Sequence, residues 1–177
     1  MSLQRRQWLI AAVGATGLAG GAWYALREER DLPGASAVAP MFTLTFDDAH
    51  GRPQPLSQWQ GRWLLVNFGA TWCAPCVEEM PMLQQAAQDY RGRDVAFVGV
   101  GIDTAAAIRR FQAELKIDSP LLVAGAGGTD LARLLGNDSG ALPYTVLIDP
   151  PGRVIRSRLG LLKPDLLRSW LESGPGR

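Results

Sequence analysis

The sequence predicts an α/β fold in which a central mixed β-sheet is flanked by helices. Short apolar runs of strand length alternate along the chain with segments whose apolar residues recur at helical spacing. A hairpin and a last helix follow these alternating units. The chain has 177 residues, of which 47% are hydrophobic and 20% are charged, so it is large enough for one folded domain with a core.

The first part of this domain is expected to contain a hairpin, a central strand and a long helix. Residues 41–46 alternate as in a strand, and the turn residues of 47–53 lead into a second short strand. Residues 63–68 form a near-continuous apolar run, which is typical of a central strand covered on both faces. Apolar spacings of three and four predict a helix over residues 74–90, which Pro81 should bend because proline removes a helical hydrogen bond.

Two strand–helix pairs are expected next. Residues 95–100 have the apolar composition of another buried strand, and residues 104–115 have apolar side chains along one side of a helix. A shorter strand over 121–123 and a helix over 130–135 follow.

The end of the chain predicts a hairpin and a helix. Residues 144–148 and 154–159 are apolar runs, separated by turn residues at 149–152. Residues 164–171 carry apolar side chains at helical spacing.

Residues 1–31 are expected to lie outside this fold and to direct export. Arg5 and Arg6 precede an uncharged stretch in which residues 8–26 would span about 28 Å as a helix, just enough to cross a bilayer. Under the positive-inside rule, both arginines stay in the cytoplasm and the rest of the chain is exported. We therefore expect a signal-anchor, with a cleaved signal peptide as the close alternative and a buried core helix as a third.

The next segment is expected to be a linker. Residues 32–40 are rich in Gly, Ala, Ser and Pro, and the domain is predicted over residues 41–177. Ala35-Ser36-Ala37 has the form of a cleavage site, although it lies far beyond the apolar stretch. Because Arg5-Arg6 with Trp8-Leu9 also resembles a twin-arginine signal, both cleavage and the export route stay open.

The charge is nearly balanced. The chain has 18 basic and 17 acidic side chains and a formal charge of +1. Residues 1–37 hold four of the basic and three of the acidic groups, so 14 of each remain in the part expected outside the cytoplasm. No run of basic residues occurs, so we expect no nucleic-acid partner.

Both cysteines lie in one motif, Thr71-Trp-Cys-Ala-Pro-Cys76, which follows an apolar strand and opens a helix. In that context a Cys-x-x-Cys pair predicts redox chemistry. At a helix start, unpaired backbone N–H groups and the helix dipole favour a thiolate at Cys73. Pro75 fits the first turn because it has no N–H to leave unpaired. We expect Cys73 to be the attacking thiolate and Cys76 to resolve the mixed disulfide.

Two other uses of the cysteine pair compete with redox chemistry. A structural disulfide would close so small a loop that it constrains the unfolded chain little. A Cu(I) or zinc site would use the thiolates as ligands, but the one histidine, His50, lies in a polar turn. We therefore expect no bound metal.

These residues resemble the thioredoxin superfamily and, within it, the TlpA/ResA-like exported thiol–disulfide oxidoreductases. The resemblance covers roughly residues 40–172, and it implies a thioredoxin-like fold with an N-terminal β-hairpin and an extra strand–helix insertion within residues 92–142. The segments that carry it are Phe42–Leu44, Asp48–Gly51, Leu56–Ser57 with Gly61, Leu65–Pro81, Val98–Asp103, Leu142–Asp149, Gly152 and Gly160.

The resemblance also implies roles for residues outside the cysteine pair. Pro143 is similar to the family's cis-proline, which faces the disulfide, and Leu142 would line the substrate groove; the alternative is an ordinary trans-proline. Trp72 matches the aromatic cover beside the nucleophile. The expected substrate-binding residues are therefore Trp72, Pro75 between the cysteines, Leu142 and Pro143.

Glu79 matches an acidic residue that ResA-like proteins place near the cysteines, where it would assist proton transfer to or from Cys76. The alternative is a solvated position on the helix surface beside Glu78. One position differs from thioredoxin itself and another from the family. Asn67 stands where thioredoxin has a buried aspartate, and Gly69 stands where the family usually has a tryptophan, which opens space beside the strand.

The resemblance implies a membrane-tethered periplasmic oxidoreductase, most simply a reductase of client disulfides such as those of apocytochrome c or copper-site assembly proteins. The sequence has no flavin or nicotinamide motif, so we expect no cofactor, and electrons would come from a membrane donor. The alternatives are a disulfide-forming oxidant and a Cu(I)-binding metallochaperone. A peroxiredoxin-like peroxidase would need a threonine three residues before Cys73, where Ala70 stands.

Overall fold

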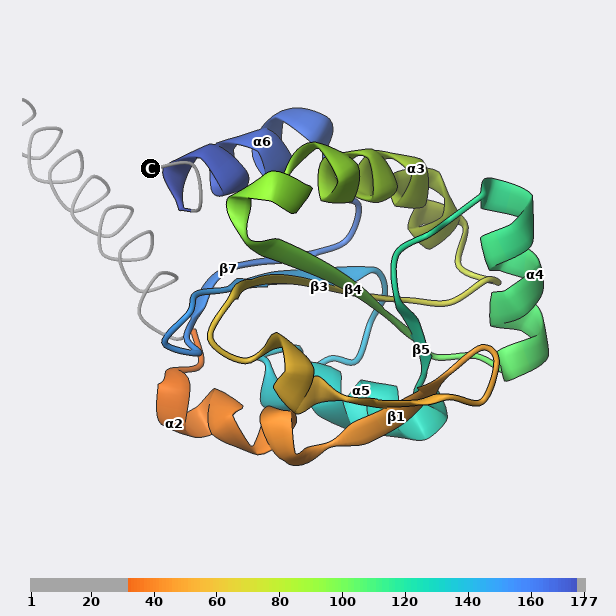
Figure 1. Cartoon of the computed structure of the whole chain (residues 1–177), viewed down its shortest axis with the longest axis horizontal. Coiled ribbons are helices and arrows are strands. Elements are labelled where there is room, and N and C mark those ends of the chain that lie inside the picture. Colours follow the sequence, from red (N-terminus) through yellow and green to blue (C-terminus); the bar gives the residue numbers. More distant parts are fainter. Residues whose placement is uncertain (1–31, 175–177) are drawn as a thin grey trace, which may run out of the picture. The chain divides into compact units, whose positions relative to one another are not determined.

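The computed structural model describes residues 32–174 (Figure 1), and the compact unit begins at Pro33. The expected signal segment over 1–31, including the span over 8–26, lies outside the described residues. None of the helices within 32–174 is long and apolar enough to cross a membrane.

A mixed β-sheet forms the centre of the described chain, with seven strands in the order β2-β1-β5-β4-β3-β6-β7. The central strand β4 runs parallel to both β3 and β5, whereas the other neighbouring pairs are antiparallel. The β1–β2 hairpin is the expected N-terminal hairpin, and it joins the sheet through β5. The strands are β1 (Thr45–Asp48), β2 (Pro53–Pro55), β3 (Trp63–Gly69), β4 (Val95–Gly101), β5 (Leu121–Val123), β6 (Tyr144–Ile148) and β7 (Val154–Leu159).

Helices cover both faces of the sheet, as the sequence predicts. In Figure 1, α3 and α6 lie on one side of the sheet and α2 and α5 on the other, with α4 at one end. The α-helices are α2 (Ala35–Val38), α3 (Ala74–Asp89), α4 (Ala105–Leu115), α5 (Gly125–Leu134) and α6 (Pro164–Ser173). Short 3₁₀ helices span Ala39–Thr43, Leu56–Trp59 and Arg91–Arg93.

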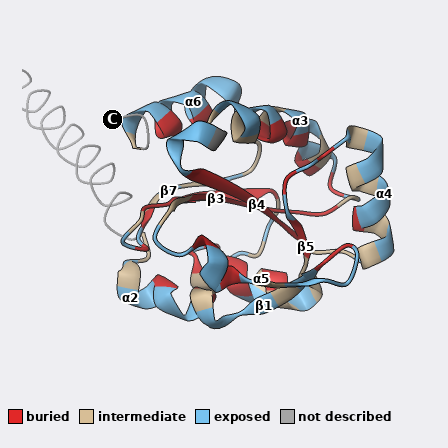
Figure 2. Cartoon of the chain, in the orientation of Figure 1, coloured by how far each residue is buried: buried red, intermediate tan, exposed pale blue. Residues whose placement is uncertain are grey.

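The central strands are buried on both faces, which explains their near-continuous apolar sequences (Figure 2). Because side chains alternate along a strand, Leu65, Asn67 and Gly69 of β3 point to the same face. That face carries α3, since Leu65 joins one buried cluster with Leu83 of that helix. β3 therefore places the polar side chain of Asn67, and Gly69 with no side chain, next to the start of α3.

The N-terminal part of the domain differs from the sequence prediction. Residues 35–38 and 39–43 are helical, where a linker over 32–40 and a strand from 41 were expected, and the strand begins at Thr45. Val38 and Met41 are almost completely buried, at 0% and 1% exposure. Their spacing of three residues places them on one side of a helical turn, so packing favours helix over strand.

The other boundaries shift less. The helix expected over 130–135 begins earlier, at Gly125, and ends at Leu134. The first long helix ends at Asp89, and it continues through Pro81, where a bend was expected. The β4–β6 connection adds α4, β5 and α5, which supplies the expected extra strand and helix.

We predict that the segment before β1 contributes to stability. Met41→Ala should lower the free energy of unfolding by about 2–5 kcal/mol, because it removes a fully buried side chain. Leu44→Ala, at a position that is 37% exposed, should change it by no more than about 0.5 kcal/mol. Urea unfolding of the two variants measures the difference, and equal effects would mean that residues 35–43 do not pack on the domain in solution.

Candidate active site

Cys73 and Cys76 form a disulfide at the start of α3, with their Cα atoms 5.3 Å apart. Cys73 is the N-cap residue, and its carbonyl oxygen accepts hydrogen bonds from the backbone N–H groups of Cys76 (3.0 Å) and Val77 (3.1 Å). Cys73 is 7% exposed and Cys76 is 2% exposed. Cys73 is therefore the more exposed residue of the pair, which is consistent with the predicted attacking role.

The helix start favours a negative charge on Cys73 once the disulfide opens. The first turn of α3 contains Pro75 and no acidic residue. Its remaining N–H groups and the positive end of the helix dipole point toward the N-cap residue. A thiolate at this position would be stabilised by both effects, which favours Cys73 as the nucleophile of thiol exchange.

Hydrogen bonds with the residues that follow β4 hold the loop between β3 and α3 in place. Asp103 follows β4, and its carboxylate accepts hydrogen bonds from the Thr71 hydroxyl (2.6 Å) and the Thr71 N–H (3.2 Å). The Ile102 N–H donates to the Gly69 carbonyl (2.9 Å), and the Cys73 N–H donates to the Ala70 carbonyl (3.1 Å). These bonds fix the backbone that leads into the cysteine motif.

Sequence reasoning missed Asp103 as part of the site, although a signal was present. β3 and β4 are parallel and in register to their last residues, so their carboxyl ends meet at one edge of the sheet. Burial alone would raise the pKa of Asp103, but hydrogen bonds from Thr71 and Thr104, with Arg110 nearby, outweigh it and lower the pKa below its usual value.

Leu142 packs beside the disulfide, and its peptide bond to Pro143 is cis, as the resemblance predicts. Leu142 is partly buried against Cys73 and Cys76, and the buried Pro143 accepts a hydrogen bond at its carbonyl from the Gly160 N–H (2.8 Å). Trp72, next to Cys73 in the sequence, is 70% exposed, so an aromatic side chain flanks Cys73.

Glu79 is 2% exposed, so the alternative of a solvated helix position is wrong. Its two carboxylate oxygens accept hydrogen bonds from the Asn67 side-chain amide (2.7 Å) and from the Leu162 backbone N–H (2.9 Å). Burial raises the pKa of Glu79 above its usual value, and these hydrogen bonds offset only part of the rise. Because Glu79 lies three residues after Cys76 on α3, both side chains face the same side of the helix.

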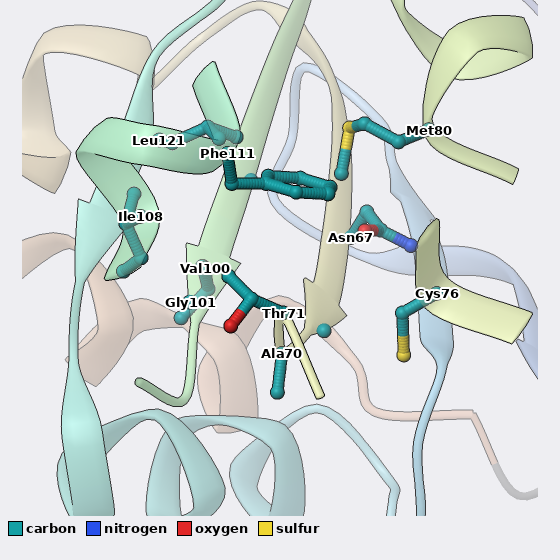
Figure 3. Close-up of a pocket in the computed structure, with 12 residues that line it drawn as sticks. Asn67, Ala70, Thr71, Cys76, Met80, Val100, Gly101, Ile108, Phe111 and Leu121 are labelled. Atoms are coloured by element: carbon teal, nitrogen blue, oxygen red, sulfur yellow. The ribbon is translucent and has the colours of Figure 1, made fainter. Parts of the chain in front are cut away.

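A small cavity lies behind Cys76, at the end of β3 and β4 (Figure 3). Its volume is about 30 Å³, and its lining includes Asn67, Gly69, Cys76, Met80 and Phe111. A Cβ built on Gly69 would lie 3.2 Å from the Cys76 Cβ, so the cysteine packs directly over the glycine. Gly69 therefore leaves room for Cys76 to pack against β3, next to the cavity.

His50 lies apart from the cysteines. It is exposed in the β1–β2 turn, and β1 is three strands away from β3 in the sheet, or about 14 Å at ~4.8 Å per strand. Among residues 32–174, no three His, Cys, Asp or Glu side chains are grouped closely enough to hold a metal ion.

The sequence profile of the AhpC/TSA family matches residues 35–157, which contain β1 to β6 and most of β7, the cysteine pair and the cis-proline. The chain belongs to the AhpC/TSA family. Its relatives include the thiol-disulfide oxidoreductase ResA of Bacillus subtilis, which is 28% identical over 75% of this chain and 72% of that protein. ResA of Bacillus cereus is 30% identical over 76% of this chain and 75% of that protein. This AhpC/TSA member is thus a thiol–disulfide oxidoreductase.

Solved structures agree with the thioredoxin-like fold of this family member. A thioredoxin family thiol:disulfide interchange protein from Chlorobium tepidum has a TM-score of 0.65 at 24% identity, and the match covers 75% of this chain and 93% of that one. A secreted disulfide oxidoreductase of Mycobacterium tuberculosis has a TM-score of 0.63 at 20% identity, with coverages of 76% and 98%.

We predict that Asp103 adds stability that depends on pH. Its folded pKa lies below the unfolded value of about 3.9, so its contribution is complete above that value and is lost as the pH falls through the folded pKa. Asp103→Asn should therefore be less stable than the native protein at pH 7, by about 1–3 kcal/mol. Urea unfolding at several pH values measures this gap, which should narrow below about pH 4. A gap that stays constant would contradict an ionised role for Asp103.

Proposed function

We propose that this oxidoreductase is exported, anchored in the inner membrane through residues 8–26, and reduces disulfides in periplasmic client proteins. Cytochrome c maturation, in which apocytochrome c must be reduced before haem attachment, is one such use. The observation that carries the proposal is the cysteine pair at a helix start with a buried carboxyl, Glu79, behind Cys76. A soluble periplasmic protein, released by cleavage of the N-terminal segment, would carry out the same chemistry.

The exchange transfers two electrons from the protein to the client. The Cys73 thiolate attacks one sulfur of the client disulfide, which forms a mixed disulfide and releases the other client sulfur as a thiolate that takes a proton from water. Cys76 then loses its proton and attacks the Cys73 sulfur. This step releases the second client sulfur, which is protonated in turn, and leaves the Cys73–Cys76 disulfide.

Glu79 is the proposed acceptor of the Cys76 proton. A carboxyl with a raised pKa exchanges protons closer to neutral pH than an ordinary one does. The hydrogen bonds from Asn67 and Leu162 hold its oxygens in fixed positions, so its location relative to Cys76 does not depend on solvent. On reduction of the protein, the same carboxyl would return a proton to Cys76.

The client is proposed to bind across the surface formed by Trp72, Pro75, Leu142 and Pro143. Trp72 and Pro75 are exposed beside the disulfide, whereas Leu142 is half-buried against it. These side chains are apolar, so they favour a client segment with apolar residues next to its cysteine. The reducing equivalents are proposed to come from a membrane donor, because the sequence has no flavin or nicotinamide motif.

The other candidate functions find less support. A peroxidase of the peroxiredoxin type would need a hydroxyl three residues before Cys73, and Ala70 supplies none. A copper site that adds a histidine to the two thiolates would need that histidine nearby, and His50 is three strands away. An oxidant that forms disulfides would use the same residues, so the reduction potential distinguishes it from a reductase.

We predict a reduction potential near that of thioredoxin, about −270 mV, for the Cys73–Cys76 pair. The full chain would be equilibrated in dithiothreitol buffers, and its free thiols would be counted by alkylation. A value near that of DsbA, about −120 mV, would reverse the proposed direction of electron flow and make the protein an oxidant.

We also predict that Glu79→Gln slows the second step of exchange selectively. Attack by Cys73 on a model disulfide should keep its rate, whereas release of the mixed disulfide by Cys76 should slow by about 10²-fold near neutral pH, because the proton acceptor is lost. The defect should shrink as the pH rises and Cys76 ionises without help. Stopped-flow exchange measures both steps, and Glu78→Gln, at the exposed neighbouring residue, is the matched control. Equal slowing of both steps would contradict this role.

A further inference from the structure

One buried polar atom beside the cysteines lacks a partner. Within residues 32–174, Asn67 Oδ1 accepts no hydrogen bond, although its residue is 1% exposed. The amide nitrogen faces two acceptors, since it donates both to Glu79 Oε1 (2.7 Å) and to Thr145 Oγ1 (3.0 Å). Buried acceptors are almost always paired in folded proteins, so this one calls for an explanation.

The free oxygen and the Cys76 sulfur lie against the same glycine. A Cβ built on Gly69 would lie 3.6 Å from Cys76 Sγ and 3.7 Å from Asn67 Oδ1. No side chain separates the two atoms at that position, because residue 69 has none. Both residues also line the cavity behind the disulfide, as Figure 3 shows.

The cavity suits a sulfur atom better than a water molecule. Its volume of about 30 Å³ exceeds that needed by one water, but a buried water requires two to four polar partners. The polar side chains in the lining are Asn67 and Thr71, and because the Thr71 hydroxyl already donates to Asp103, a water here would find no free side-chain donor. The rest of the lining is apolar or glycine, apart from Cys76 itself.

We propose that Asn67 is the hydrogen-bond acceptor for the Cys76 thiol in the reduced protein. When a dithiol donor delivers two electrons and two protons and is itself oxidised to a disulfide, the Cys73–Cys76 bond opens and its sulfurs separate. Cys76 Sγ then turns into the cavity, and its S–H donates to Asn67 Oδ1. This inference rests on the proposed function, because the dithiol is the form that attacks clients.

The amide would then join the two groups that exchange the proton. Its nitrogen holds Glu79, and its oxygen holds the protonated Cys76 thiol. Cys76 is kept protonated, and hence inactive, until Cys73 has formed the mixed disulfide. Because the acceptor is unpaired in the disulfide form and paired in the dithiol form, Asn67 also favours reduction of the pair. Asn67 is a positioning residue in this scheme, and Gly69 provides the space.

The wild-type protein offers a direct test, because it contains two asparagines, Asn67 and Asn137. The Asn137 side-chain oxygen already accepts from Ser139 Oγ (2.9 Å) and Gly140 N (3.1 Å), so it serves as an internal control. In protein labelled with ¹³C-asparagine, reduction should shift the side-chain carbonyl signal of Asn67 far more than that of Asn137. An Asn67 signal that moves no more than the control would overturn the proposal.

A second test observes the thiol itself. Cys73→Ala leaves Cys76 as the one cysteine of the chain, so its infrared S–H band is unobscured by another thiol. We expect this band at lower frequency than that of a free thiol. Adding Asn67→Leu should return it to the free-thiol frequency. Adding Glu79→Leu instead should leave it shifted, although both changes remove the Asn67–Glu79 hydrogen bond. The opposite pattern would assign the thiol to Glu79 and overturn the proposal.

Asn67→Leu alone should also lower the equilibrium constant for reduction by dithiothreitol about three- to tenfold. An unchanged constant would contradict the proposed preference for the dithiol form. A separate assay measures whether the wild-type protein reduces the disulfides of insulin, which tests the proposed function. Failure in that assay with a shifted S–H band would reject the proposed function and leave the thiol–amide bond intact, whereas activity with an unshifted band would reject this inference alone.

Discussion

The buried carboxylate of Glu79 sets the constraint on which the site depends. A charged or protonated carboxyl that is 2% exposed must find hydrogen-bond donors inside the protein. It finds one on β3, in Asn67, and another at Leu162, in the segment that precedes α6. Three parts of the chain that are far apart in sequence are therefore held together directly behind Cys76. The same bonds that stabilise the fold also fix the position of the proposed proton acceptor.

The loop after β4 holds the backbone that leads into the cysteine pair. Because β3 and β4 are parallel and end in register, the residues that follow them lie at one edge of the sheet. Asp103 uses this proximity to bind Thr71 through two hydrogen bonds, just before the cysteine motif. The backbone entering α3 is thus fixed by the sheet, while the helix start supplies the electrostatic environment of Cys73. Geometry and thiolate stabilisation come from different elements.

Two residues of β3 that look unrelated in the sequence lie together in the structure. Asn67 stands where thioredoxin itself has an aspartate, and Gly69 stands where the family usually has a tryptophan. Alternation along β3 brings both to the face that carries α3. There the glycine leaves space next to Cys76, and the asparagine presents an unpaired oxygen beside that space. Both residues therefore shape one small volume behind Cys76.

The sequence by itself determined the central strands, the helix that follows the cysteines and the redox motif, because each depends on local composition or on a short motif. The cis-proline was expected from the family resemblance alone. Tertiary structure decided the rest. Residues 35–43 are weakly patterned, and the burial of Val38 and Met41 makes them helical. Glu79 and Glu78 are indistinguishable along the helix until the packing of α3 buries one of them. The Thr71–Asp103 bond and the orientation of the Asn67 amide join residues from different elements. Such contacts depend on how strands and helices meet, which no local pattern of residues specifies.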